Sequence, residues 1–127
     1  MNSDRFSLRS RFGSFKYAFR GISALLSDEH NARIHAIAAV AVIILGFVLK
    51  VNPVEWCLLI IVIGLVFITE LINSSLEKIA DVADPQWNEM IGKAKDYSAA
   101  AVLISAGVSL IIGGLIFIPR FLLLILT

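Results

Sequence analysis

The sequence has 127 residues, a formal net charge of +1, a hydrophobic fraction of 58% and a mean hydropathy of +0.87. An ordinary soluble domain is roughly 45–50% apolar, so this composition argues against a soluble protein and predicts one integral membrane domain over residues 1–127. The small net charge gives no reason to expect a nucleic-acid partner, and the single cysteine, Cys57, excludes a disulfide or a cysteine metal site within one chain.

The N-terminal segment, about residues 5–27, has the pattern of an amphipathic surface helix. Large apolar side chains recur there at spacings of three and four, which is the period of one helix face. These residues are Phe12, Phe15, Phe19, Ile22 and Leu26. A basic amphipathic helix beside a membrane span usually lies in the interface. The pattern fits a plain topology anchor and a helix that controls substrate access equally well.

Three apolar segments follow, at about residues 32–51, 54–77 and 96–118. Each approaches the roughly 20 residues that a helix needs to cross a bilayer. A barrel strand would alternate between polar and apolar residues, and these segments do not. The turn 50–53 joins the first two segments as an antiparallel hairpin, and Pro119 is expected to end or kink the third. The predicted fold is all-α, with three transmembrane helices and a surface helix.

The distribution of basic residues predicts the orientation of the spans in the membrane. Lysine and arginine favour the cytoplasmic side, and here they gather before the first span and in the expected second loop, residues 78–95. They are Arg5, Arg9, Arg11, Lys16, Arg20, Arg33, Lys78, Lys93 and Lys95. The N-terminus and the loop 78–95 are therefore expected in the cytoplasm, and the C-terminus outside.

The most informative stretch begins at Glu70, directly after the apolar run 58–69. At 100° per residue its polar side chains share one helix face. They are Glu70, Asn73, Glu77 and Asp81. A carboxylate deep in a bilayer costs about 2.5–3.5 kcal/mol on insertion scales, and less near the boundary, so Glu70 indicates a functional site. The alternative is a structural glutamate bonded to a neighbouring helix.

This polar helix face suits phosphoryl transfer to the hydroxyl of a lipid that cannot leave the membrane. That reaction uses a divalent metal on the nucleotide phosphates and a base or positioning group at the attacking hydroxyl. Magnesium prefers a few carboxylates together with phosphate oxygens and water. Glu29 and Glu77 are candidate magnesium ligands, Glu70 can reach a lipid hydroxyl, and Asn73 can orient Glu70 or a phosphate.

Two further polar clusters flank this face. Lys95 is placed to neutralise a phosphate, and Asp96 can pair with Lys95 or bind nucleotide, whereas Lys93 is better explained as a positive-inside anchor. Residues 27–33, just before the first span, form the second cluster. These residues either belong to the site or are polar only because they lie at a helix end at the membrane surface. Because all three clusters fall on the same predicted side, a single cytoplasm-facing site is expected.

Other familiar site patterns are missing. The sequence has neither G-x-x-x-x-G-K-[ST] nor G-x-G-x-x-G, so it lacks a P-loop or protein-kinase nucleotide site. His30 and His35 lack the partner pattern of a metal site, and Trp56 and Trp87 are first interpreted as interfacial anchors.

The string Glu70-x-Ile-Asn73-Ser-Ser-Leu-Glu77-x-x-x-Asp81 resembles the signature of the prokaryotic diacylglycerol kinase family. It departs at Ala80, where that family more often has valine. The resemblance covers nearly the whole chain, because segments 15–22, 29–33 and 95–103 are also similar to the family.

The resemblance implies a homotrimer in the bacterial inner membrane, with active sites shared between subunits and with ATP and Mg²⁺ as partners in the reaction. Glu70 resembles the general base, and Glu29 and Glu77 resemble the metal ligands. The residues that correspond to nucleotide-binding positions are Tyr17, Glu29, Asn73, Glu77, Asp81, Lys95 and Asp96. Weaker correspondences are Gln86, Trp87 and Asn88, whose loop departs from the family pattern, and a basic contact from Arg9 or Arg11.

The implied reaction is phosphorylation of diacylglycerol to phosphatidic acid, or alternatively of undecaprenol to undecaprenyl phosphate. Residues 29–35 resemble the undecaprenol kinase branch. A small transport subunit is a different explanation, but it predicts ionisable residues at mid-span depth, and here they cluster at one boundary. A membrane scaffold would leave the polar face that begins at Glu70 unexplained.

Overall fold

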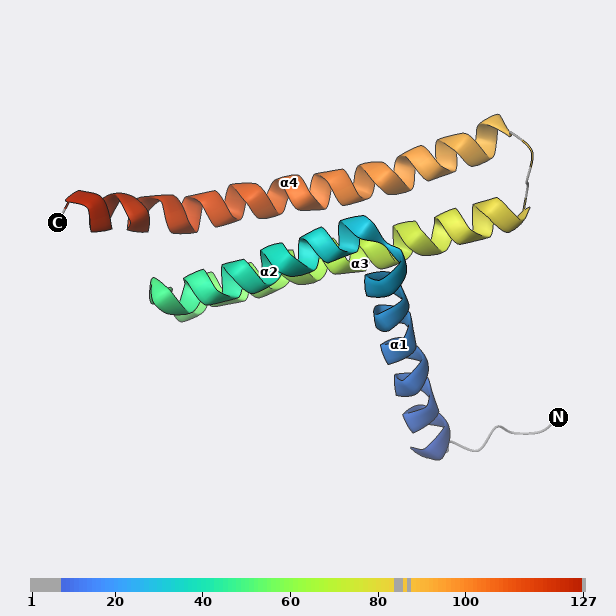
Figure 1. The fold of residues 1–127 in the computed structure, drawn as a ribbon, viewed down its shortest axis with the longest axis horizontal. Helices are drawn as coiled ribbons and strands as arrows, with labels where there is room; N and C mark the ends of the chain where they lie inside the picture. Colours follow the sequence, from blue (N-terminus) through green and yellow to red (C-terminus); the bar gives the residue numbers. More distant parts are fainter. Residues whose placement is uncertain (1–7, 84–85, 87, 127) are drawn as a thin grey trace.

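The computed structural model describes residues 8–83, 86 and 88–126, and all regular structure in these residues is helical. The helices are α1 (Leu8–Asp28), α2 (His30–Val48), α3 (Pro53–Ala83) and α4 (Glu89–Leu126). α2, α3 and α4 lie side by side, with α4 packed mainly on α3, and α1 leaves this bundle at a steep angle (Figure 1). The described part of the chain is therefore an all-α bundle with one projecting helix.

α2, α3 and α4 are each long and apolar enough to cross a membrane. At 1.5 Å per residue, the 19 residues of α2 extend about 28 Å, close to the roughly 30 Å of a bilayer's hydrocarbon core. The 31 residues of α3 and the 38 of α4 extend about 46 and 57 Å. Both extend beyond α2 at the end where α1 joins (Figure 1). These ends of α3 and α4 are therefore long enough to lie outside the hydrocarbon core of a bilayer.

One sequence prediction about helix ends is wrong. The expected loop 78–95 is mostly helical, since α3 continues to Ala83 and α4 begins at Glu89. Of the two alternatives expected at Pro119, an end or a kink of the third helix, the structure excludes the end, because α4 continues to Leu126.

Arg120 explains how α4 passes the proline. Pro119 has no backbone N–H and removes one helical hydrogen bond. Arg120 donates from Nη1 and Nη2 to the Glu55 carboxylate on α3, at 2.7 and 2.5 Å, and from Nη1 to the Ile116 carbonyl at 3.0 Å. These contacts hold the turn beyond the proline in helical register and fasten it to the start of α3.

The turn between α2 and α3 is defined by its capping interactions. Lys50 adopts a left-handed backbone conformation with φ of 50°, which ends α2. The Asn52 side chain accepts from the Glu55 backbone N–H at 3.0 Å, and the Glu55 carboxylate accepts from the Asn52 N–H at 2.8 Å. This reciprocal box, followed by Pro53 at the first helical position, starts α3 directly after the turn.

Close packing of α2 on α3 near this turn depends on Gly46. It is buried against the Trp56 ring, which packs against a cluster of Val51, Leu59, Ile116 and Phe117. A Cβ at position 46 would come within 2.6 Å of Trp56 Cη2. Glycine is therefore required here by the approach of the neighbouring ring.

Replacing Gly46 with alanine is expected to lower the free energy of unfolding. Overpacking costs about 1–3 kcal/mol, which exceeds the helix-propensity gain of about 1 kcal/mol for alanine over glycine. Gly21→Ala is the matched control, because the added Cβ meets nothing within 4 Å and should leave stability unchanged or raise it. Thermal unfolding in detergent measures both variants. A Gly46→Ala protein that melts at or above the wild-type temperature would show that the Trp56 ring can move away freely.

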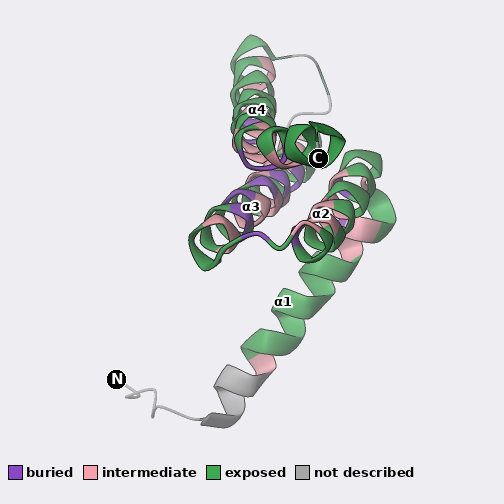
Figure 2. Cartoon of the chain, turned by 90° about the vertical axis from the view of Figure 1, so that its left-hand side faces the viewer, coloured by how far each residue is buried: buried purple, intermediate pink, exposed green. Residues whose placement is uncertain are grey.

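The α3–α4 interface contains small hydroxyl side chains. Thr69 and Ser105 share a hydrogen bond of 2.8 Å, and Ser109 donates to the Val62 carbonyl at 3.3 Å. Small polar residues allow helices to approach closely in a membrane. The buried positions of α3 are Leu59, Val62, Val66, Glu70 and Ser74, which form one stripe along that helix. Figure 2 shows this buried stripe, while most of the surface of α2 and α4 is exposed.

Candidate active site

Glu70 lies on the buried stripe of α3 and is only 3% exposed. Its Oε1 is 3.2 Å from His35 Nε2, which comes from α2. This separation is within ion-pair distance, but the pair lacks the geometry of a formed hydrogen bond, so Oε1 has no hydrogen-bond donor within the described residues. Glu70 is thus a deeply buried carboxylate that faces an imidazole from the adjacent helix.

Asn73 and Glu77 occupy the next turns of α3. Asn73 Nδ2 donates to Glu77 Oε1 at 3.1 Å, which confirms that these two predicted residues share a helix face. Asn73 Oδ1 is buried and accepts no hydrogen bond from the part of the chain that the structure covers. A buried acceptor without a donor costs about 1–3 kcal/mol. Asn73 Oδ1 therefore suits an external donor such as a hydroxyl or water.

Glu29 is the residue at which α1 gives way to α2. Its extended backbone, with φ of −101° and ψ of 119°, interrupts the two helices. Glu29 and Glu77 both lie within electrostatic range of Glu70, so the structure brings the three predicted carboxylates into one region. Their mutual repulsion favours a cation between or beside them.

Lys78 links this region to the end of α1. Its Nζ lies 3.2 Å from the Asp28 carboxylate and 3.8 Å from that of Glu29. The hydrogen bond from Lys78, supported by a second from Ser27, holds the pKa of Asp28 below its usual range. Lys78 therefore fastens the α1–α2 junction to α3 and offsets part of the negative charge.

The residues present are compatible with a magnesium ion, although they do not form a complete cage. No group of three or more His, Cys, Asp or Glu side chains in the described residues could hold a metal by itself. Mg²⁺ at phosphoryl-transfer sites is commonly bound by one or two carboxylates together with substrate phosphates and water. Glu29 and Glu77, both half-buried near the unpartnered oxygens, provide that smaller set.

Lys95 forms its ion pair with Asp81 of α3, at 2.9 Å, and not with the adjacent Asp96. Of the two alternatives for Asp96, pairing with Lys95 or binding nucleotide, the first is therefore not observed in the described residues. Residues adjacent in a helix point in different directions, whereas α3 and α4 run together at this end. Asp96 is exposed and is available to solvent.

The other predicted contacts lie farther from this cluster or outside the described residues. Tyr17 is exposed on α1, where the Arg20 guanidinium lies 5.7 Å from its ring centroid. Asn88 caps α4, accepting from the Met90 backbone N–H at 2.9 Å. Gln86 is exposed in the connection. Trp87 and the side chains of Arg9 and Arg11 lie outside the part that the structure describes.

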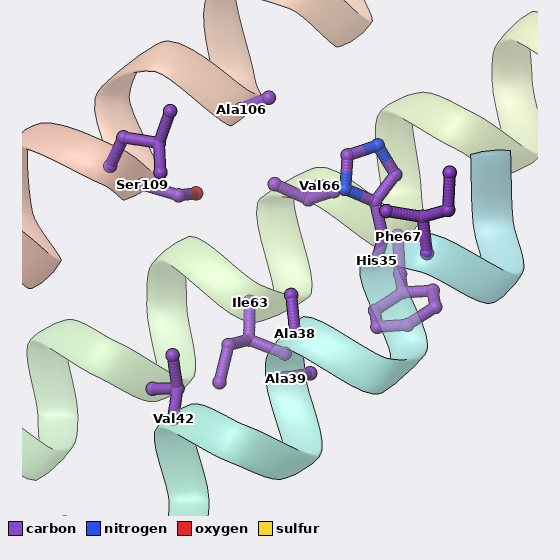
Figure 3. A pocket seen from close by; sticks show the side chains of 11 residues that line it. His35, Ala38, Ala39, Val42, Ile63, Val66, Phe67, Ala106 and Ser109 are labelled. Atoms are coloured by element: carbon purple, nitrogen blue, oxygen red, sulfur yellow. The ribbon is translucent and has the colours of Figure 1, made fainter. Parts of the chain in front are cut away.

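An apolar cavity of about 290 Å³ opens between α2, α3 and α4 (Figure 3). Aliphatic and aromatic side chains form most of its wall, and His35 and Ser109 are its polar members. The aliphatic and aromatic members include Ile34, Val42, Ile63, Val66 and Phe67. Because His35 also contacts Glu70, the imidazole lies between this cavity and the buried carboxylate.

Two residues at this site were not identified from the sequence. The sequence gives His35 no metal-site pattern and places it only in a segment that resembles one family branch, and it gives Lys78 only a role in topology. The pattern did contain one hint, since His35 is a polar residue just inside an apolar span. Their partners are 35 and 50 positions away in the chain, a relation that helix periodicity does not provide.

Comparison with known proteins identifies the family. The profile of the prokaryotic diacylglycerol kinase family matches residues 16–117. The chain is 39% identical over 116 residues to an undecaprenol kinase of Bacillus subtilis, covering 91% of this chain and 94% of that protein. It is 36% identical over 107 residues to a diacylglycerol kinase of Synechocystis, covering 84% of this chain and 61% of that protein.

A diacylglycerol kinase of Escherichia coli is 33% identical over 95 residues, which cover 75% of this chain and 78% of that protein. These relatives are all named as kinases, and the three apolar helices fit a membrane protein. The chain therefore belongs to the prokaryotic diacylglycerol kinase family and is a lipid kinase.

Proposed function

We propose that this protein transfers the γ-phosphoryl group of Mg-ATP to the hydroxyl of a membrane lipid, with Glu70 as the general base. The observation that carries this assignment is the position of Glu70. Its carboxylate is buried between helices, and the neighbouring His35 lines an apolar cavity on one side. Other charged groups gather toward the overshooting ends of α3 and α4. A hydroxyl from the bilayer and a phosphate from water can meet at such a boundary.

In the proposed step, the lipid oxygen attacks the γ-phosphorus of ATP. The bond between that phosphorus and the oxygen that bridges to ADP breaks, and ADP leaves with the electron pair. Glu70 takes the hydroxyl proton as the new phosphorus–oxygen bond forms. A carboxylate within reach of the proton contributes about 10²–10⁴-fold to such a transfer.

Glu29 and Glu77 are the proposed holders of Mg²⁺, which would neutralise charge on the phosphates. Asn73 keeps Glu77 in place through its 3.1 Å hydrogen bond. Lys95, fixed by Asp81, supplies positive charge for a phosphate, and Asp96 and Tyr17 are proposed as outer nucleotide contacts.

We further propose that the chain functions as a homotrimer in the bacterial inner membrane, with the site on the cytoplasmic side. Many large apolar side chains of the spans are exposed in the single chain, and lipid together with neighbouring subunits would cover them. Lys78, Lys93 and Lys95 all lie near the overshooting ends of α3 and α4, which supports a cytoplasmic assignment of that end. α1 would lie along the membrane surface.

Undecaprenol is the first acceptor to test, and diacylglycerol the second. The Bacillus subtilis relative named undecaprenol kinase aligns over more of both chains, and at higher identity, than the Escherichia coli diacylglycerol kinase. Diacylglycerol remains a candidate because several relatives carry that name. The apolar lining of the cavity does not distinguish the hydrocarbon chains of the two lipid classes.

Phosphate transfer from radiolabelled Mg-ATP in mixed micelles, with each lipid offered separately, tests the function and the acceptor together. We expect undecaprenol to be labelled at least about tenfold faster, a difference of about 1.4 kcal/mol in transition-state free energy. Faster labelling of diacylglycerol would reverse the order of acceptors. No labelled lipid from folded protein would refute the kinase assignment for these two acceptors.

A further inference from the structure

His35 is a polar residue that contacts the buried Glu70 carboxylate and also lines the apolar cavity. Its Nε2 is 3.2 Å from Glu70 Oε1, and its ring forms part of the cavity wall beside Val66 and Phe67 (Figure 3). Glu70 is 3% exposed and its Oε1 accepts no formed hydrogen bond from any described group. This imidazole is therefore the only described donor close to that oxygen.

We propose that His35 is a positioning residue, which holds the Glu70 carboxylate in the orientation that accepts the lipid hydroxyl proton. The inference rests on the proposed role of Glu70 and deepens it. With the proton on Nε2, the imidazole can donate to Oε1 after a small rotation, which leaves the other carboxylate oxygen for the substrate. An unrestrained carboxylate would instead sample several rotamers.

The surroundings of Glu70 make such a restraint necessary. Glu29 and Glu77 lie within electrostatic range and repel a carboxylate at position 70. Among the described residues that face it, only His35 supplies a compensating donor, because Lys78 is bound to Asp28 and lies near Glu29. A charge-assisted hydrogen bond in a low-dielectric interior is stronger than one in water.

The position of His35 in the cavity wall gives this restraint a second consequence. A hydrocarbon chain in the cavity would pack against the same ring that orients Glu70. Chain binding and carboxylate orientation would then be coupled through one side chain. The coupling predicts that loss of the imidazole lowers turnover more than it weakens nucleotide binding.

Two replacements of His35, one with leucine and one with glutamine, test the proposal when their effects are compared. Glutamine can place its amide N–H near the site of Nε2, whereas leucine fills the space without a donor. We expect His35→Leu to lower kcat for the lipid by about 10- to 100-fold, as expected for a misplaced reacting group. KM for Mg-ATP should stay within about twofold of wild type, and His35→Gln should recover most of the lost kcat.

His30→Leu is the matched control, because His30 is exposed in the first turn of the same helix. It should leave kcat unchanged. Equal losses in His35→Leu and His35→Gln would overturn the proposal, and so would a loss confined to KM for Mg-ATP. A His35→Leu enzyme with normal kcat would also overturn it.

Infrared difference spectroscopy provides a second readout that needs no turnover. The spectrum of wild type minus Glu70→Gln identifies the carboxyl band of Glu70. That band should shift in His35→Leu and return toward its wild-type position in His35→Gln. An unshifted band in His35→Leu refutes the contact itself. If the band shifts as expected but no acceptor lipid is phosphorylated, the positioning contact stands and the proposed kinase reaction fails.

Discussion

Glutamine at position 70 is expected to abolish lipid phosphorylation while the protein stays folded. The amide has nearly the same shape as the carboxyl group but cannot accept the proton of the lipid hydroxyl. Loss of general-base catalysis lowers a rate by about 10²–10⁴-fold, so kcat should fall by at least about 100-fold. Initial rates in mixed micelles measure this, with radiolabelled ATP to detect residual transfer.

Glu89→Gln is the matched control for this substitution. Glu89 is an exposed glutamate at the start of α4 whose described partner is Lys93, at 2.7 Å. The same change there should leave kcat within about twofold, because exposed ion pairs contribute little. Near-normal turnover by Glu70→Gln would remove Glu70 from the chemical step. An unfolded Glu70→Gln protein would point instead to the structural alternative, in which Glu70 mainly joins α3 to α2.

The sequence predicted the helical bundle well because membrane spans are determined by local composition. A run of about 20 apolar residues without the alternation of a barrel strand is helical in a bilayer, since only helices and closed barrels satisfy the backbone hydrogen bonds there. This argument identified all three apolar helices. It did not determine their polar ends, because Lys78 and Lys95 lie in helices that continue beyond the apolar stretches.

Pro119 shows a second limit of local reasoning. Proline is expected to break a helix, and that expectation considers only the chain near position 119. The compensating contact comes from Glu55, which lies 65 residues before Arg120. No periodicity in the sequence connects these two positions, so the sequence could not decide whether the helix ends at Pro119 or continues beyond it.

The candidate site was predictable only in part, for the same reason. Helical spacing placed Asn73 and Glu77 together, and their hydrogen bond is present. Spacing alone could not select Asp81 over Asp96 as the partner of Lys95, or bring His35 to Glu70, because both contacts join different helices. Contacts between helices depend on how the bundle packs, which a single sequence does not specify.

Glutamine at position 77 is expected to raise the magnesium requirement of the reaction without unfolding the protein. Its side-chain oxygen can still accept the hydrogen bond from Asn73 Nδ2, so the local structure should persist. The substitution removes one of two proposed carboxylate ligands, and Mg²⁺ binds neutral amides more weakly than carboxylates. We expect the Mg²⁺ concentration for half-maximal rate to rise at least about tenfold, which is about 1.4 kcal/mol of binding free energy.

Titration of Mg²⁺ at fixed ATP, with Glu89→Gln again as the control, measures this effect. Glu29→Gln should shift the titration in the same direction. Glu29 precedes Glu70 in the sequence and Glu77 follows it, but both lie within electrostatic range of the Glu70 carboxylate. If both act on one ion, high Mg²⁺ should restore much of the rate in each single variant, whereas it should not rescue Glu70→Gln. An unchanged Mg²⁺ dependence in Glu77→Gln would contradict its role as a ligand and leave Glu77 as a partner of Asn73 alone.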